Sequence, residues 1–243
     1  MKNIKKILTA SALATATVLS SCGGGATQTP TAKFNTSVDT ASYAIGVLMG
    51  TQLHEQILPT LKNINTDNFI AGFKAAVEDT ASLKMQPREA QQAFMKIMQK
   101  IMDEQAAENL AKGNKFLDEN AKKDGVVSLP NGIQYIVLEE GNGQKPTIDD
   151  QVECDYVGTL IDGSKFDSSI DRGQPAKFHL KGVIKGWQET ITLMSVGSKW
   201  KIFIPAELGY GAQDRPGIPA NSVLIFEVTL HQIIKPEADK NKK

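Results

Sequence analysis

The chain has 243 residues, a length that accommodates one or two folded domains with accessory segments. Hydrophobic residues make up 41% of the chain and charged residues 22%, so it has enough apolar side chains to build cores and is not a disordered protein. The 27 Lys and Arg residues are balanced by 27 Asp and Glu residues, which argues against nucleic acid as a partner. The two cysteines, Cys22 and Cys154, are too few for a disulfide framework and match no zinc-ligand spacing, so we expect no bound metal.

The N-terminus has the pattern of an export signal. Three lysines within the first six residues precede an apolar run over residues 7–19, which is too short to span a bilayer of about 30 Å as a helix. The run ends in Leu19-Ser20-Ser21-Cys22, which resembles the bacterial lipobox. That resemblance implies a signal peptide over residues 1–21 and a lipid on Cys22, whereas the alternative is an ordinary secretory peptide with an incidental cysteine.

Residues 22–36 are rich in Gly, Thr, Ala and Pro, which is typical of a flexible tether. The residue after Cys22 is Gly23 rather than an aspartate of the kind that often retains lipoproteins at the inner membrane. We therefore expect attachment to the bacterial cell envelope through a lipid anchor, at the outer membrane and facing the periplasm.

Helical patterns follow the tether. Residues 37–86 carry apolar side chains at three-to-four spacing on more than one face, with Pro59 expected to close a first helix and Thr66-Asp67 to cap a second. Pro87 is suited to the first turn of a third helix, which is predicted to run over residues 87–124 because helix-forming residues dominate there.

The composition changes at Asp124-Gly125, where we place a domain boundary. Residues 125–235 contain alternating segments typical of strands, among them Val152, Cys154 and Tyr156, and one short helix is expected over residues 186–194. The pattern predicts an α+β domain in which one face of an antiparallel sheet packs on a helix, followed by a polar tail at 236–243. A chain that begins near Gly125 is expected to fold by itself.

Several motifs lie beside the turns of this domain: Phe166-Asp167-Ser168-Ser169, Val183-Ile184-Lys185-Gly186-Trp187, Ala206-Glu207-Leu208-Gly209-Tyr210-Gly211 and Pro216-Gly217-Ile218-Pro219. In their order they resemble the FKBP-type peptidyl-prolyl isomerases, and the resemblance covers residues 143–234. It implies a sheet half-wrapped around a short helix, with an apolar pocket for prolyl peptides between them and no cofactor.

The resemblance also implies roles for single residues. Asp167, Tyr210 and Trp187 are the expected catalytic residues, with Trp187 as the pocket floor, Asp167 beside the twisted amide and the Tyr210 hydroxyl near the substrate carbonyl. Arg172 is expected to hold Asp167, and the backbone N–H of Ile184 to donate a hydrogen bond. The remaining expected wall residues are Tyr156, Phe166, Val183, Ile184, Ile218 and Phe226. Without the family pattern, such aromatic residues are ordinary core residues.

The sequence departs from the family pattern at some positions. Ala176 stands where many members carry an aromatic residue, Arg215 where a histidine is common, and two loops are short. These departures leave open the preferred substrate. They also leave open an alternative function, a holdase or interaction scaffold that binds proline-containing segments with little turnover.

The helical half resembles the N-terminal domain of the macrophage-infectivity-potentiator type of these isomerases, through Ser42-Tyr43-Ala44-Ile45-Gly46 and Phe69-Ile70-Ala71-Gly72-Phe73. This resemblance implies a homodimer in which the long helix separates two isomerase domains, and unfolded or partly folded polypeptides as partners. The length of the helical segment also favours a dimer, because so few helical residues rarely stabilise a core alone.

Overall fold

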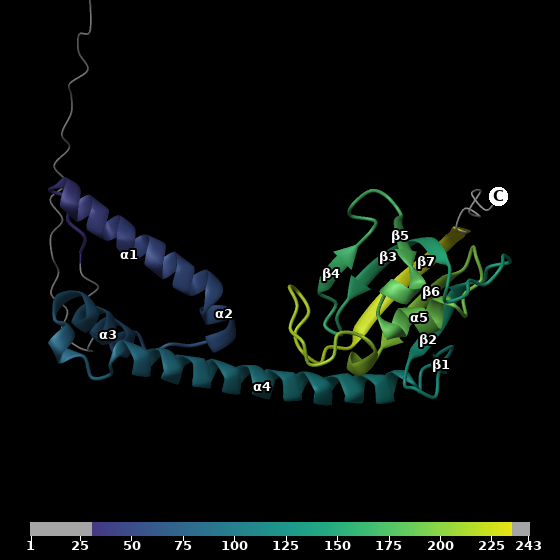
Figure 1. The fold of residues 1–243 in the computed structure, drawn as a ribbon, viewed down its shortest axis with the longest axis horizontal. Coiled ribbons are helices and arrows are strands. Elements are labelled where there is room, and N and C mark those ends of the chain that lie inside the picture. Colours follow the sequence, from purple (N-terminus) through teal and green to yellow (C-terminus); the bar gives the residue numbers. More distant parts are fainter. Residues whose placement is uncertain (1–30, 235–243) are drawn as a thin grey trace, which may run out of the picture. The chain divides into compact units, whose positions relative to one another are not determined.

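The computed structural model describes residues 31–234 (Figure 1). The expected signal peptide, Cys22, tether residues 22–30 and the tail at 236–243 lie outside the described residues. The described chain forms two compact units that divide after Leu53, near the end of the first helix. Each unit is therefore described by itself.

The first unit consists mainly of helix α1 (Ser37–Gln56). Its start is capped reciprocally, since the Asp39 N–H donates to Thr36 Oγ1 at 3.1 Å and the Thr36 N–H donates to Asp39 Oδ2 at 2.8 Å. None of its residues is buried, and several large apolar side chains are exposed, among them Val38, Tyr43 and Leu48. α1 thus carries large apolar side chains that are not buried within its own unit.

Two short helices open the second unit. α2 (Leu58–Leu61) has Pro59 in its first turn, whereas the sequence pattern placed this proline at the end of the first helix. The difference arises because proline lacks an N–H and so is well suited to a helix start. α3 (Thr66–Glu78) is capped by Asn65, whose side chain accepts from the Asn68 N–H at 2.9 Å, and a 3₁₀ turn, η1 (Thr80–Ser82), follows it.

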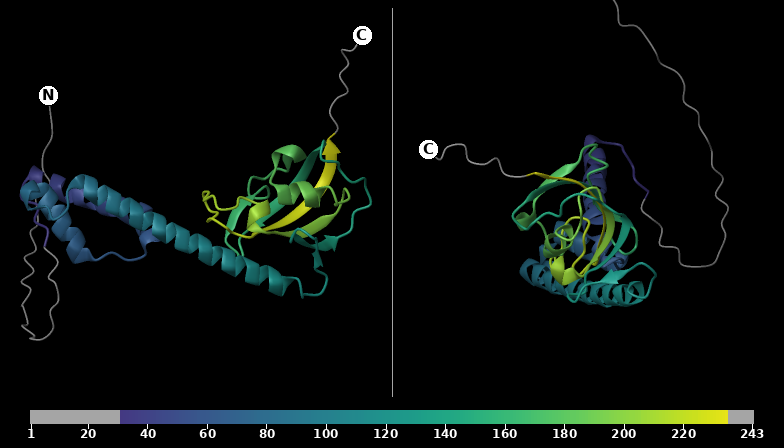
Figure 2. Two further views of the ribbon diagram at one scale, coloured as in Figure 1. Left: turned by 60° about the horizontal axis from the view of Figure 1, so that its bottom comes forward. Right: turned by 90° about the vertical axis from the view of Figure 1, so that its right-hand side faces the viewer.

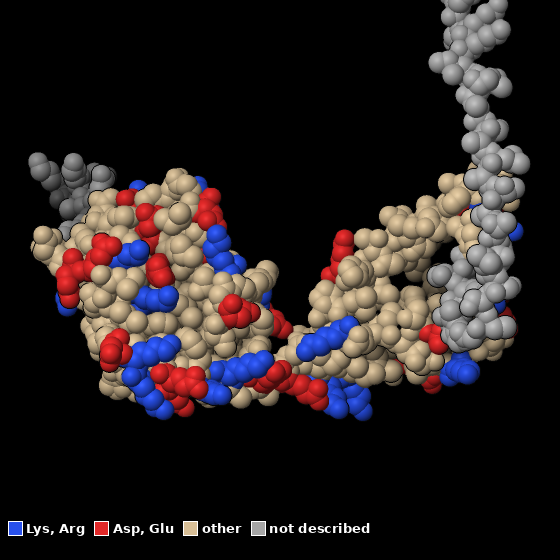
Figure 3. All heavy atoms as spheres, turned by 180° about the vertical axis from the view of Figure 1, so that it is seen from behind, with Lys and Arg blue, Asp and Glu red and all other residues tan. Residues whose placement is uncertain are grey.

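The long helix α4 (Pro87–Asn120) has 34 residues. It begins at the proline that the sequence identified, and the Glu89 carboxylate accepts from the Gln86 N–H at 3.0 Å in the first turn. Acidic and basic side chains alternate along its surface, with four i,i+4 ion pairs on α3 and α4 (Figure 3). Among residues 31–234, no helix is both long enough and apolar enough to cross a membrane.

The C-terminal part of the second unit is an antiparallel sheet. Within the described residues its seven strands run in the order β1-β2-β6-β7-β3-β4, and β5 pairs with the other end of β3. The strands are β1 (Val127–Ser128), β2 (Gln134–Glu139), β3 (Gln151–Thr159), β4 (Lys165–Ser168), β5 (Ala176–His179), β6 (Lys199–Ile204) and β7 (Leu224–Ile234). Helix α5 (Lys185–Ile191) packs on one face of this sheet through Trp187 and Ile191 (Figure 2). The predicted α+β class is confirmed.

The main core lies between α5 and the sheet. Along β3 the buried residues alternate with partly exposed ones, and Val152, Cys154 and Tyr156 face the core as the sequence predicted. Burial also raises the pKa of the Cys154 thiol to about 12, with the neighbouring Asp155 and Glu153 acting in the same direction. Cys154 is therefore an inert core thiol.

The sheet is buried on its other face as well, which the sequence analysis did not predict. Phe203, Val223 and Ile225 form a second buried cluster with Leu117, which comes from the last turns of α4. The strand pattern of β6 accordingly ends in three consecutive buried residues rather than in a strict alternation. The long helix is thus part of the packing of the sheet domain.

Polar contacts reinforce the docking of α4. The Asn109 side-chain amide donates to the Ala220 carbonyl at 3.0 Å, and the Asn221 amide donates back to the Ala106 carbonyl at 3.1 Å. Gly113 is required at the crossing point, because a Cβ there would lie 2.8 Å from Val223 Cγ2. The packing therefore extends upstream of the domain boundary expected at Asp124-Gly125.

Candidate active site

One cavity of about 440 Å³ opens between α5, the ends of β3, β4, β5 and β7, and the loop that precedes β7. Its lining is mainly apolar and aromatic: Tyr156, Phe166, Asp167, Phe178, Gly182, Val183, Ile184, Trp187, Tyr210, Arg215, Pro216, Ile218 and Phe226. A concave apolar site with a few polar groups is typical of a binding pocket for a small group or side chain.

Trp187 forms the centre of the aromatic lining. Its side chain is 4% exposed, and its ring meets the rings of Tyr156, Phe178 and Phe226 in edge-to-face arrangements at centroid distances of 5.2–5.4 Å. The preceding Gly186 lets the start of α5 approach β6, because a Cβ there would clash with the Ile204 side chain. Within the described residues the Trp187 indole N–H has no hydrogen-bond partner.

A polar cluster of Tyr156, Asp167 and Arg172 forms one side of the cavity. The Tyr156 hydroxyl donates to Asp167 Oδ2, and the Arg172 guanidinium donates to Asp167 Oδ1 and, at 2.7 Å, to the Tyr156 oxygen. The Ser168 N–H adds a fourth bond, donated to Asp167 Oδ1 at 2.8 Å. The carboxylate is therefore fixed in orientation and its charge is neutralised locally.

The environment shifts the proton affinities of this cluster. Burial opposes ionisation of Asp167, but the hydrogen bonds from Tyr156, Arg172 and Ser168 outweigh it and lower the pKa of the carboxyl. Burial, aided by the hydrogen bond to Asp167, raises the pKa of Tyr156 to about 12. At neutral pH the site therefore contains an ionised Asp167 and a neutral Tyr156 hydroxyl.

A second layer of contacts holds β4 against β3. Ser169 is fully buried, its Oγ accepts from the Tyr156 N–H at 2.9 Å, and its hydroxyl donates to Asp155 Oδ1 at 2.8 Å. Asp155 in turn lies 2.8 Å from His231 Nε2 on β7, and this bond to His231 is the largest cause of a lowered pKa of Asp155. These bonds fix the positions of Tyr156 and Asp167 relative to each other.

The opposite rim of the cavity is built by the loop from Tyr210 to Ile218. Arg215 and Ile218 exchange two backbone hydrogen bonds of 2.9 Å around Pro216 and Gly217, and Gly217 has a φ of +76°. This is a tight turn that requires glycine at its third position. The Arg215 guanidinium carbon lies 4.7 Å from the centre of the Tyr210 ring, within the range of a cation–π contact.

The structure brings together the residues that the resemblance named. The lining includes Asp167, Tyr210 and Trp187 as well as the wall residues Tyr156, Phe166, Val183, Ile184, Ile218 and Phe226. Arg172 is outside the lining and contacts the pocket only through Tyr156 and Asp167.

Sequence reasoning missed Phe178, Gly182 and Pro216 as lining residues, and it noted Arg215 only as a departure from the family. Phe178 pairs with Val152 across β3 and β5, so it shares the core face of that strand pair. The alternation Ala176-Lys177-Phe178 was the signal that could have identified it.

Two family models match the chain. Residues 142–231 match FKBP-type peptidyl-prolyl cis-trans isomerase, and residues 38–137 match the domain amino terminal to FKBP-type peptidyl-prolyl isomerase. The crystal structure of FkpA from Escherichia coli superposes with a TM-score of 0.68 at 35% identity, covering 85% of this chain and 100% of that one.

Named relatives are similar to this chain over both halves. The FKBP-type peptidyl-prolyl cis-trans isomerase FkpA of Aeromonas hydrophila is 42% identical over 87% of this chain and 82% of its own length. The outer membrane protein MIP of Legionella longbeachae is 36% identical over 85% of this chain and 90% of its own length. Since such relatives match both the helical half and the pocket-bearing half along most of their length, this chain belongs to the FKBP-type peptidyl-prolyl cis-trans isomerases.

Proposed function

We propose that this isomerase binds the prolyl ring of an Xaa–Pro segment against Trp187 and assists the folding of exported proteins. The observation that carries the proposal is the apolar aromatic cavity with one locally neutralised carboxylate at its side. An uncharged ring such as that of proline fits this chemistry, because it buries apolar surface without leaving a polar group unpaired.

The proposed mechanism needs neither a nucleophile nor a general base. Rotation about a peptide bond faces a barrier of about 18–20 kcal/mol because the planar form is stabilised by resonance. The planar amide is also the more dipolar form, so removal from water destabilises the planar form relative to the twisted form. If desolvation and strain together remove about 6 kcal/mol from the barrier, the rate rises by roughly 10⁴.

Three polar groups around the cavity then have proposed roles. The Tyr210 hydroxyl and the Ile184 N–H orient the substrate carbonyl, and Ile184 N–H makes no hydrogen bond to other described residues. Asp167, held by Tyr156 and Arg172, provides a carboxylate of fixed orientation, paired with the Arg172 guanidinium, beside the twisting amide. Preorganised charges of this kind stabilise a transition state without reorganisation.

Asp167→Val is expected to lower kcat/KM by about tenfold or more, since bonds to a charged group contribute about 1.5–3 kcal/mol. Tyr210→Phe removes one uncharged hydrogen bond and is expected to cost roughly two- to tenfold. The rates are measured on proline tetrapeptides by exchange NMR, with circular dichroism to check the fold. Undetectable turnover by the folded wild-type protein would favour the holdase alternative.

We further propose that two copies of the chain form a homodimer through residues 37–86. Ile70 and Phe73 on α3 are 54% and 40% exposed, and α3, η1 and the start of α4 enclose an apolar cavity of about 650 Å³. Clustered exposed apolar side chains mark interaction sites, and a two-fold interface needs only one self-complementary surface. A second copy of the chain is the proposed occupant of this surface.

Light scattering on a soluble chain that begins at Gly23 is expected to give twice the chain mass. Ile70→Asp places a charge in the proposed interface and is expected to yield monomers, whereas Lys115→Gln, at an exposed position of α4 outside residues 37–86, is expected to leave the dimer intact and serves as the control. A monomeric mass for the wild-type chain at micromolar concentration would contradict the dimer.

Cys22 is proposed to carry the lipid that anchors the chain to the bacterial envelope, on the basis of Leu19-Ser20-Ser21-Cys22. The relative from Legionella longbeachae is named an outer membrane protein, which supports the same compartment. Cys22→Ser is expected to move the protein from the membrane fraction to the soluble exported fraction. Intact-mass analysis of the wild-type protein without a lipid on Cys22 would contradict the anchor.

A further inference from the structure

The cavity that binds proline in the proposed function is lined by two charged side chains, Asp167 and Arg215. Asp167 is already paired with Arg172. Within residues 31–234, Arg215 has no acidic partner, and its one side-chain hydrogen bond is a long one of 3.3 Å to the neutral Gln213. The guanidinium at the cavity rim therefore has no ion-pair partner among the described residues.

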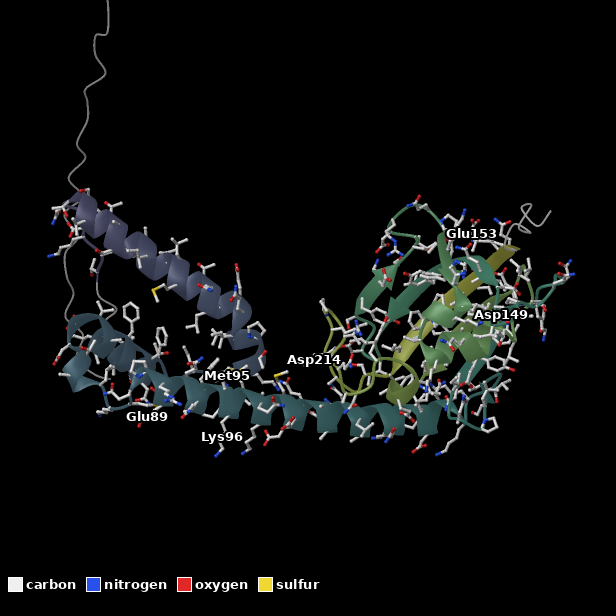
Figure 4. All side chains as sticks on the ribbon, in the orientation of Figure 1. Glu89, Met95, Lys96, Asp149, Glu153 and Asp214 are labelled. Atoms are coloured by element: carbon white, nitrogen blue, oxygen red, sulfur yellow. The ribbon has the colours of Figure 1, made fainter. Side chains whose placement is uncertain are left out.

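This charge is held in place rather than free to swing. The two backbone hydrogen bonds between Arg215 and Ile218 fix its main chain, and the Tyr210 ring lies under its guanidinium. The neighbouring acidic residue makes no ion pair with it, because the carboxylate of Asp214, labelled in Figure 4, is directed to the Ala220 N–H, from which it accepts at 2.7 Å. A preorganised guanidinium loses less conformational entropy when it binds a carboxylate.

We infer that Arg215 makes this isomerase prefer chains with an acidic side chain directly beside the proline. The inference rests on the proposed binding of the prolyl ring against Trp187. With the ring in the apolar cavity, the residues on either side of the proline must lie at the rim, where Arg215 is located. A carboxylate there pairs with the guanidinium through charge-assisted hydrogen bonds, whereas a lysine is repelled.

The expected effect is modest because Arg215 is exposed to solvent. Exposed ion pairs give about a two- to fivefold difference in an equilibrium or rate ratio. The test compares kcat/KM, by exchange NMR at pH 7, for peptides that differ only in Glu, Gln or Lys before the proline, and for a second series with the same changes after it. In at least one series the Glu peptide is expected to exceed the Gln peptide by two- to fivefold, and 0.5 M NaCl is expected to reduce this ratio towards one.

The variants isolate the charge. Arg215→Gln is expected to bring the Glu/Gln ratio to about one, and Arg215→Glu to favour the Lys peptide instead. Lys145→Gln removes one positive charge from a loop residue that does not line the cavity and is expected to leave the ratio unchanged. The readout is the ratio between peptides, so an overall change in activity of a variant does not affect the conclusion.

The two failures are distinguishable. A wild-type ratio near one in both series, or a ratio that persists in Arg215→Gln, overturns the inference about Arg215 while the isomerase activity on a Leu-Pro peptide remains. Loss of turnover on every peptide, the Leu-Pro peptide included, would instead overturn the proposed function.

Discussion

Trp187→Ala is expected to lower kcat/KM by at least about tenfold and to destabilise the fold by about 3–5 kcal/mol. The side chain is 4% exposed and contacts the rings of Tyr156, Phe178 and Phe226, so its removal leaves a void beneath the proposed substrate site as well as in the core. Urea unfolding measures the stability, and exchange NMR on a proline peptide measures the activity.

Trp187→Phe is the matched control. It keeps an aromatic ring at the floor, and it removes an indole N–H that has no partner within the described residues, so it leaves no other group unsatisfied. We expect it to retain most of the stability and a larger share of the activity than Trp187→Ala. If both variants are folded and lose activity equally, an aromatic ring at the pocket floor does not contribute to activity.

A chain that begins at Gly125 is expected to be largely unfolded, whereas a chain that begins at Met102 is expected to fold and to be active. The shorter chain lacks Leu117 and Phe116, so Phe203, Val223 and Ile225 lose the part of their cover that α4 provides. Full burial of such a side chain contributes about 1.5–3 kcal/mol, so partial exposure of all three removes a large part of the 5–15 kcal/mol that stabilises a typical domain. Circular dichroism and urea unfolding of the two chains measure the difference.

This result would replace the expectation, drawn from composition alone, that a chain starting near Gly125 folds by itself. Asn109→Ala in the full chain is a milder probe, since it removes one hydrogen bond to the Ala220 carbonyl and is expected to cost about 1 kcal/mol. If the chain starting at Gly125 matched the stability of the chain starting at Met102, the docking of α4 would contribute nothing to this domain.

Some residues of the proposed active site could be predicted from the sequence, and others could not. Asp167, Trp187 and Tyr210 belong to motifs whose order is specific, so their presence in one cavity could be expected. Phe178 has no such motif, and it lines the cavity because β5 pairs with β3. Arg215 was visible as an unusual residue, but its unpaired charge at the rim became apparent only from the contacts of the loop.

The sequence by itself determined the α+β class of the pocket-bearing domain and the face that β3 turns to the core. It also determined the start of the long helix at Pro87, because side-chain periodicity and proline geometry are local properties of the chain. Only the tertiary structure decided that α4 covers the second face of the sheet, and that Asn109 and Asn221 exchange hydrogen bonds with carbonyls more than a hundred residues away in the chain. Such contacts depend on how the turns orient whole helices and strands, which is not a local property of the chain. A single Asn or Gly113 within a polar helix does not change the hydrophobic periodicity, so the sequence pattern does not show that another surface packs against it.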